Sequence, residues 1–336
     1  MSNKRIIFTS PGVAELLDMD MPVLEDNKVI VKIVRTSLSA GTERANLIGD
    51  PNVSPTSGSA VKFPRSSGYS ASGIVAEVGN GVEHVKVGDR VACSWTKHAQ
   101  YCSVKSNAVY KLDDCIDFDE AALVHIATFP MAAIRKCRLE VGESAIVMGL
   151  GVLGLITIEL LRAAGATPII AVDPVESKRM QAIELGADYA FDPFDPNFVD
   201  NVKAVTNGGV HVAIEITGKG QGLDMVLDCM AKFGRVALLG CTRSSDFTID
   251  YYRKVHWPGI TLIGAHTMAR PNFESSEGWW TEKDDAGAIL NLIKYKRLNF
   301  KRLIEEVHSP SECTEVYNRL ATEKFFPIIQ FDWNKI

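Results

Sequence analysis

A glycine-rich segment that follows a short apolar, strand-like run carries the clearest chemistry in this sequence. Gly149, Gly151 and Gly154 form the pattern G-x-G-x-x-G, and an apolar helical stretch begins inside it. Gly149 allows a tight turn, Gly151 lets a ligand approach the backbone, and Gly154 lets the helix pack closely on the strand. The N–H groups at the helix start, including those of Val152 and Leu153, offer a positive dipole end to phosphate groups. The pattern predicts a pyrophosphate-binding turn.

An acidic residue completes this pattern. Asp173 ends the next strand-like run, about twenty residues after Gly154, where a carboxylate accepts hydrogen bonds from the ribose of an adenine dinucleotide and repels a 2′-phosphate. NAD(H) is therefore the expected cofactor, although Lys178 and Arg179 nearby would favour a 2′-phosphate. The alternative is a glycine-rich turn that binds no ligand, with Asp173 acting as a helix cap.

The segments around this turn indicate how it is positioned. Between 121 and 264, short apolar runs alternate with helical stretches of about ten to fifteen residues, which predicts a doubly wound parallel sheet of the α/β class. Before 121, β-branched residues alternate with others and glycine recurs every few positions, which predicts a small β-barrel. We therefore expect a barrel domain at 1–120, an α/β domain at 121–264, and a tail at 265–336 that packs back on the barrel.

Composition and charge narrow the class of partner. The chain has 336 residues and a formal net charge of −5, so no positive field is available to bind nucleic acid or an anionic membrane. Its N-terminus lacks the apolar core of a secretory signal, and no uncharged run is long enough to span a membrane. The 7 cysteines contain no C-x-x-C pair, which argues against a disulfide framework and a zinc knuckle. These features predict a cytoplasmic protein with a small-molecule substrate.

Several motifs together resemble one known family. S-A-G-T-E at 39–43, the glycine-rich region at 68–92, the turn at 149–154 and A-I-E-I-T-G at 213–218 are similar to segments of the medium-chain dehydrogenase/reductase superfamily, which includes zinc-type alcohol dehydrogenases. The resemblance covers nearly the whole chain. It implies a Rossmann domain and a GroES-like β-barrel catalytic domain built from both termini, with the active site in the cleft between them. It also implies a homodimer or homotetramer.

The places of the family's zinc ligands are occupied differently in this sequence. Ala40 stands where the family has a cysteine, Tyr69 stands where it has the histidine of G-H-E, and the third place falls at or near His125. One imidazole in three places does not make the open tetrahedral site of a catalytic zinc ion. The cysteines of the structural zinc lobe are also missing. We therefore expect no zinc and no other metal.

Three side chains in that emptied place are the catalytic candidates. Thr42 matches the hydroxyl that in the family contacts the reacting oxygen and begins a proton relay. Tyr69 brings a phenol, and His125 brings an imidazole that titrates near neutral pH. Each has a plainer alternative: Thr42 bonds a turn, Tyr69 fills volume, and His125 is a satisfied core histidine.

Three further residues are candidates for contact with the substrate. Glu43 follows Thr42 and could orient the relay or a substrate hydroxyl, although with Arg44 it also fits a solvated surface pair. Trp279 and Trp280 could form an apolar, sugar-stacking wall, although packing between the domains is the plainer explanation.

The predicted function is the zinc-independent, NAD(H)-dependent interconversion of a secondary alcohol and a ketone. The form of the N-terminal motif and the late stretch G-W-W-T-E-K-D-D look most like threonine-dehydrogenase-related proteins, a subgroup that includes a bacteriochlorophyllide hydroxyethyl dehydrogenase. That resemblance implies a polyhydroxylated substrate, such as a sugar or cyclitol, or another bulky one. Two alternatives remain open: an enone or quinone reductase, which usually prefers NADPH, and a nucleotide-binding protein without catalysis.

Overall fold

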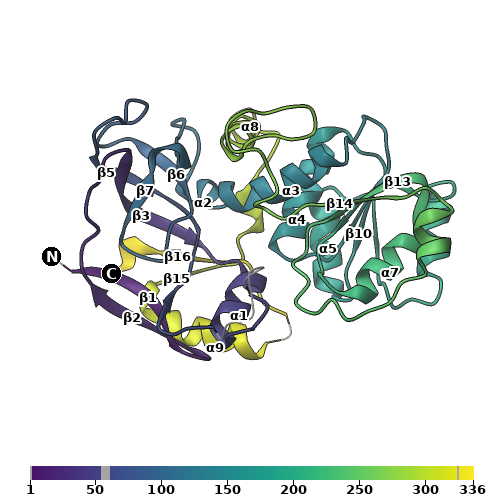
Figure 1. Cartoon of the computed structure of the whole chain (residues 1–336), viewed down its shortest axis with the longest axis horizontal. Helices are drawn as coiled ribbons and strands as arrows, with labels where there is room; N and C mark the ends of the chain where they lie inside the picture. Colours follow the sequence, from purple (N-terminus) through teal and green to yellow (C-terminus); the bar gives the residue numbers. More distant parts are fainter. Residues whose placement is uncertain (1, 54–60, 324) are drawn as a thin grey trace. The chain divides into compact units, whose positions relative to one another are not determined.

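The computed structural model describes residues 2–53, 61–323 and 325–336. Contacts within the chain divide it into two compact units (Figure 1). The terminal unit contains the residues up to 126 together with 286–336, and the central unit contains residues 127–285. Helices α3 (Val124–Lys136) and α8 (Glu282–Lys294) each begin in one unit and end in the other.

The two boundaries differ from the predicted ones. The first falls inside α3 rather than before it, and residues 265–285 belong to the central unit instead of returning to the barrel. Side chains explain the second difference, because the guanidinium carbon of Arg135 on α3 lies 3.5 Å from the ring centre of Trp280. Arg135 Nε also donates to the buried Asp285 at 2.8 Å. These contacts hold the segment on the central unit.

The terminal unit is built from β-strands of both chain ends, as the resemblance implies. Its larger sheet has the order β15-β16-β3-β5-β6-β8, and β7 also pairs with β3. These strands are β3 (Lys28–Ser37), β5 (Ser70–Val78), β6 (Arg90–Ser94), β7 (Tyr101–Lys105), β8 (Val109–Lys111), β15 (Glu306–His308) and β16 (Ile329–Asp332). The smaller sheet has the order β2-β1-β4, made of β1 (Asn3–Ser10), β2 (Val13–Met19) and β4 (Arg65–Ser66).

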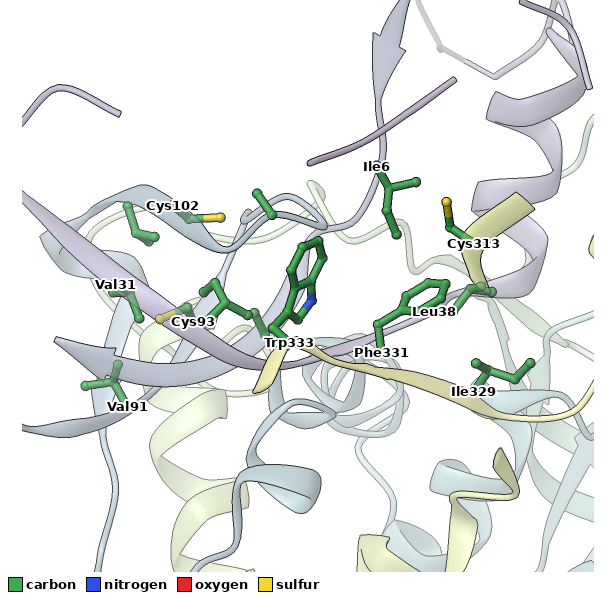
Figure 2. Close-up of a cluster of buried hydrophobic side chains, with 14 of the residues drawn as sticks. Ile6, Val31, Leu38, Val91, Cys93, Cys102, Cys313, Ile329, Phe331 and Trp333 are labelled. Carbon is green, nitrogen blue, oxygen red and sulfur yellow. The ribbon is translucent and has the colours of Figure 1, made fainter. Parts of the chain in front are cut away.

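Helices of the terminal unit lie against these sheets. They are α1 (Ala40–Ile48), α2 (Phe118–Ala121) and α9 (Cys313–Thr322), with 3-10 turns at Ser106–Ala108, Phe300–Leu303, Pro310–Glu312 and Trp333–Lys335. Helix α9 contacts α1 and β2 (Figure 1). The core contains side chains from both chain ends, among them Ile6, Leu38, Cys313, Phe331 and Trp333 (Figure 2). Buried apolar side chains of strands from both chain ends meet in this core.

The central unit is the doubly wound domain that the sequence predicts. All strand pairs of its sheet are parallel, in the order β11-β10-β9-β12-β13-β14. The strands are β9 (Ala145–Met148), β10 (Ile169–Val172), β11 (Tyr189–Phe191), β12 (Val210–Glu215), β13 (Met230–Leu238) and β14 (Thr261–Gly264). The helices are α4 (Val152–Ala164), α5 (Glu176–Leu185), α6 (Phe198–Val205) and α7 (Gly220–Asp228), with a π-helical turn at Tyr252–His256.

This strand order fixes where a ligand can bind. The order reverses at β9, so the chain leaves β9 and β12 in opposite directions and opens a crevice at their carboxyl ends. Strands β9 and β10 read AIVM and IIAV and are fully buried, as expected of central strands in a parallel sheet. No helix in the described ranges is long and apolar enough to cross a bilayer.

Candidate functional site

The glycine-rich turn lies at the carboxyl end of β9, directly before α4. Gly149 has φ 100°, a left-handed conformation that favours glycine. A Cβ on Gly154 would lie 2.0 Å from the carbonyl oxygen of Gly149, so only glycine lets the helix approach the turn so closely. A Cβ on Gly151 would meet nothing within 4 Å, so the backbone at the start of α4 borders open space. The N–H groups of Val152 and Leu153 lie in this first helical turn.

Asp173 lies directly after β10 and is joined to this turn. Its Oδ2 accepts a hydrogen bond from Leu150 N at 2.9 Å, and its Oδ1 accepts one from Val175 N, also at 2.9 Å. The second bond is made to Val175, the N-cap residue of α5. Asp173 therefore has a local capping role, as the alternative without a ligand expects. Arg179 donates to the carbonyl of Asp173 at 2.8 Å and to the Asp192 carboxylate at 3.5 Å.

A further acidic residue in this region, Glu215, lies in the A-I-E-I-T-G motif but was not among the candidate site residues. Glu215 ends β12, next to β9, and its Oε1 accepts hydrogen bonds from the backbone N and the hydroxyl of Thr217. Burial raises the pKa of Glu215, and the hydrogen bonds oppose that rise. A Cβ on Gly149 would lie 3.1 Å from the methyl carbon of Thr217, so this turn borders the glycine turn. An acidic residue at the end of a buried apolar strand is the sequence signal that could have revealed it.

In the terminal unit, the structure brings Tyr69 and His125 together. Their ring centres lie 5.5 Å apart in an edge-on arrangement. Trp95, which the sequence analysis did not single out, lies 4.6 Å from the His125 ring and donates its backbone N–H to the Tyr69 carbonyl at 2.7 Å. His125 is 1% exposed, whereas Trp95 is 46% exposed. The three rings therefore form a cluster in which Trp95 offers the largest accessible surface.

Thr42 and Glu43 lie on α1, and they differ in accessibility. Thr42 is half-buried, and its carbonyl accepts a hydrogen bond from the Asn46 side chain at 2.7 Å. Glu43 is 1% exposed, so its carboxylate is not presented to a substrate, and the prediction that it contacts one needs correction. Nor is it half of a surface pair, because Arg44 donates to the carbonyls of Leu320 and Glu323, both at 2.7 Å.

Trp279 and Trp280 belong to the central unit and stack on cations of α3. The Nζ of Lys136 lies 4.8 Å from the ring centre of Trp279, and Arg135 covers Trp280. Lys136 is itself buried and donates to the carbonyl of Gly264 at 3.2 Å, and burial lowers its pKa. Packing against these cations within one unit accounts for both tryptophans, and packing between domains is not needed to explain them.

The residues at the three zinc-ligand places do not fit a catalytic zinc ion. Ala40 has no donor atom, Tyr69 has a phenol and His125 has an imidazole, whereas such a site needs three protein ligands of the Cys, His, Asp or Glu types. Across the described ranges, no three such side chains are grouped closely enough to hold a metal.

The fold and the turn define a class of protein: a doubly wound nucleotide-binding unit joined to a GroES-like unit. Comparison with known proteins agrees. Residues 25–128 match the family model "Alcohol dehydrogenase GroES-like domain", and residues 152–279 match "Zinc-binding dehydrogenase". L-threonine 3-dehydrogenase of Pyrococcus horikoshii is 30% identical over 296 residues, which cover 79% of this chain and 83% of the relative. The chain belongs to the zinc-type alcohol dehydrogenase family of the medium-chain dehydrogenase/reductase superfamily, as its motifs predict.

Two further matches extend over more of the chain. D-guloside 3-dehydrogenase of Escherichia coli (strain K12) is 24% identical over 334 residues, which cover 94% of this chain and 95% of the relative. A protein of Sinorhizobium meliloti 1021, solved with NADP bound, has the same fold with a TM-score of 0.82 and 20% identity, covering 99% of both chains.

Proposed function

We propose that this protein is an NAD(H)-dependent oxidoreductase that interconverts a secondary alcohol and a ketone without a catalytic zinc ion. The observation that carries the proposal is the turn at the carboxyl end of β9, where Gly154 packs on Gly149 and Asp173 bonds Leu150 N. This arrangement matches what an adenine dinucleotide needs: a backbone open to the pyrophosphate and a carboxylate for the ribose. The carboxylate disfavours a 2′-phosphate, so we propose NAD(H) rather than NADP(H).

Side chains of the terminal unit are proposed to handle the proton and the oxyanion, which the cofactor does not. NAD(H), when bound, accepts or supplies the hydride. Oxidation of an alcohol also releases the hydroxyl proton, and the Thr42 hydroxyl is the group proposed to hold that proton at the substrate oxygen. The imidazole of His125, beside Tyr69, is proposed to accept the proton from Thr42 during oxidation, and the Tyr69 phenol is proposed to donate a hydrogen bond to the oxyanion that develops on the substrate.

The substrate is proposed to be polyhydroxylated or bulky. Trp95 is 46% exposed and lies beside Tyr69 and His125, and aromatic faces bind the apolar C–H faces of sugar rings. The similarity to a D-guloside dehydrogenase supports the same class. An enone or quinone reductase is the second candidate, and Asp173 is the observation that weighs against it, because such enzymes usually prefer NADPH.

The test is absorbance at 340 nm with NAD⁺ and a panel of secondary alcohols, polyols, cyclitols and sugars, with and without a chelator. NADH production that is insensitive to the chelator is expected, and activity abolished by the chelator would contradict the proposal. Thr42→Val should lower kcat by about 10²-fold or more, the usual contribution of a proton-transfer group, while NADH affinity stays unchanged. Thr42→Ser is the matched control that keeps the hydroxyl. A fully active Thr42→Val variant would remove Thr42 from the mechanism.

A further inference from the structure

Glu43 is a buried carboxylate that collects donors from four separate segments of the terminal unit. Its Oε1 accepts from Ser39 N at 3.0 Å, at the start of its own helix. Its Oε2 accepts from the hydroxyl of Ser67, at 3.0 Å, and from the hydroxyl of Tyr317 on α9. The His98 Nε2 lies 3.1 Å from Oε2 and 3.2 Å from Oε1. The four donors supply the hydrogen bonds that a carboxylate loses when it leaves water.

The charge of Glu43 is retained in this environment. Burial by itself raises the pKa of a carboxyl group. Electrostatic attraction to His98 and the hydrogen bonds from His98, Tyr317 and Ser39 nevertheless hold the pKa of Glu43 below its ordinary value. Glu43 is therefore an ion in the interior, and its donors must stay in place because an unpaired buried charge is costly.

Thr36 links His98 to the C-terminal segment of the terminal unit. Trp333 Nε1, which can only donate, bonds Thr36 Oγ1 at 3.0 Å, and His98 Nδ1 lies 2.7 Å from the same oxygen. Thr36 Oγ1 therefore accepts from Trp333 and also bonds His98 Nδ1. On its other side, the His98 ring bonds the Glu43 carboxylate through Nε2. His98 thus links Trp333, through Thr36, to Glu43.

This cluster joins the two segments that carry candidate catalytic groups. Glu43 follows Thr42 on α1, whereas Ser67 precedes Gly68 and Tyr69 between β4 and β5. Gly68 has φ 90°, and a Cβ there would lie 2.6 Å from the backbone N of His98 and 2.8 Å from its ring. His98 N also donates to the carbonyl of Ser67 at 2.9 Å. One buried carboxylate and one buried imidazole thus hold both segments.

We propose that Glu43 and His98 are positioning residues that hold the Thr42 hydroxyl and the Tyr69 ring in the relative positions that the reaction needs. The inference rests on the proposed function, because it assigns Thr42 something to do. Neither residue touches substrate or cofactor, since both are buried, at 1% and 0% exposure. In this chain the link between α1 and the 67–69 segment is a network of hydrogen bonds around one negative charge.

The first experiment needs no substrate. Hydrogen–deuterium exchange of the full chain is measured for Glu43→Gln, with Gln330→Met as the matched control. Gln330 is also fully buried in the terminal unit, but its amide bonds Ser37 and Asp119 instead of the cluster. Glu43→Gln should raise exchange by about tenfold in peptides covering 40–48 and in those covering 67–70, with the central unit unchanged. A rise in only one of the two segments, or an equal rise in Gln330→Met, would overturn the inference.

The second experiment is a double-mutant cycle in kcat between Glu43→Gln and Thr42→Val, at a temperature well below the unfolding transition of each variant. Glu43→Gln should lower kcat by about tenfold with an unchanged KM for NAD⁺, and should have no further effect once Thr42 is valine. Additive effects would reject the positioning role. If Thr42→Val is itself fully active, the role proposed for Thr42 fails instead, and the exchange experiment still decides whether the cluster joins the two segments.

Variants of His98 separate positioning from charge. His98→Gln keeps one donor for Glu43 and one acceptor for Thr36, so it should retain kcat within about threefold, whereas His98→Leu should match Glu43→Gln. Equal loss in both His98 variants would show that the hydrogen bonds of this residue are not what matters, and would overturn the positioning role of His98.

Discussion

A methyl group added at Gly151 should have a different effect from one added at Gly154. At Gly154 the new Cβ would lie 2.0 Å from the Gly149 oxygen and 2.9 Å from its carbonyl carbon, so α4 must move by more than 1 Å. Overpacking of this kind costs about 3 kcal/mol, and a unit of this size loses about 2–4 °C of melting temperature per kcal/mol. Gly154→Ala should therefore lower the Tm of the central unit by roughly 6–12 °C.

Gly151→Ala should fold normally and fail to bind the cofactor. Gly151 has φ −71°, which alanine adopts freely, and its Cβ meets no protein atom. The loss of a favourable cap residue and the reduced entropy of the unfolded chain nearly cancel, so the Tm should change by less than about 3 °C. The methyl group would occupy the place where the pyrophosphate approaches the backbone. Each lost hydrogen bond to a charged phosphate is worth about 1.5–3 kcal/mol, so NADH affinity should fall by at least about tenfold.

The assay is calorimetric unfolding together with a fluorescence titration of NADH for both variants. Gly151→Ala with wild-type NADH affinity would refute the argument, because the open space beside Gly151 would then not be where the dinucleotide lies. Gly154→Ala with an unchanged Tm would show that the close approach of α4 to Gly149 is not tight in solution.

Two further predictions concern charged groups. Asp173→Ser should weaken NADH binding and strengthen NADPH binding, by about tenfold each, because the repulsion of a 2′-phosphate disappears; an unchanged ratio of the two dissociation constants would mean that Asp173 does not contact the ribose. Hydrogen bonds from Arg319, together with His308, lower the pKa of Glu306 to about 2. The ionised Glu306 therefore contributes its full stabilisation above its ordinary pKa of 4.5, and this stabilisation is lost as the pH falls from 4.5 toward 2. Glu306→Gln should therefore remove about 1 kcal/mol of unfolding free energy at pH 7, after allowance for solvent screening, and make acid unfolding shallower; equal acid sensitivity of both proteins would contradict this assignment.

The local geometry of the candidate nucleotide-binding turn could be predicted from the sequence. Gly149, Gly151, Gly154 and Asp173 lie within one strand–helix–strand segment, where backbone geometry and short-range hydrogen bonds decide the structure. The alternation of strand and helix patterns predicted the doubly wound sheet for the same reason, and the strand order β11-β10-β9-β12-β13-β14 confirms it. The family resemblance, carried by motifs along the whole chain, is confirmed by the comparisons.

The limits of the units depended on contacts that have no local signature. The sequence predicted that the chain returns to the barrel at 265, whereas residues up to 285 stay with the central unit. Cation–π contacts from Arg135 and Lys136 to the two tryptophans, and the ion pair to Asp285, decide that boundary.

The surroundings of the candidate catalytic groups were decided by tertiary structure alone. The sequence placed Thr42, Tyr69 and His125 by their chemistry, but it gave His98 no role. It left Glu43 either beside the relay or substrate or in a solvated surface pair. The two lie 55 residues apart in the chain and meet only because β3, α1, α9 and the loop before β7 enclose them. The interaction between a carboxylate and an imidazole is strong in the protein interior, whereas the same pair exposed to water would add little to stability. Spacing in a sequence reveals which groups are available for chemistry, whereas the dielectric and the partners around each group exist only after the chain has folded.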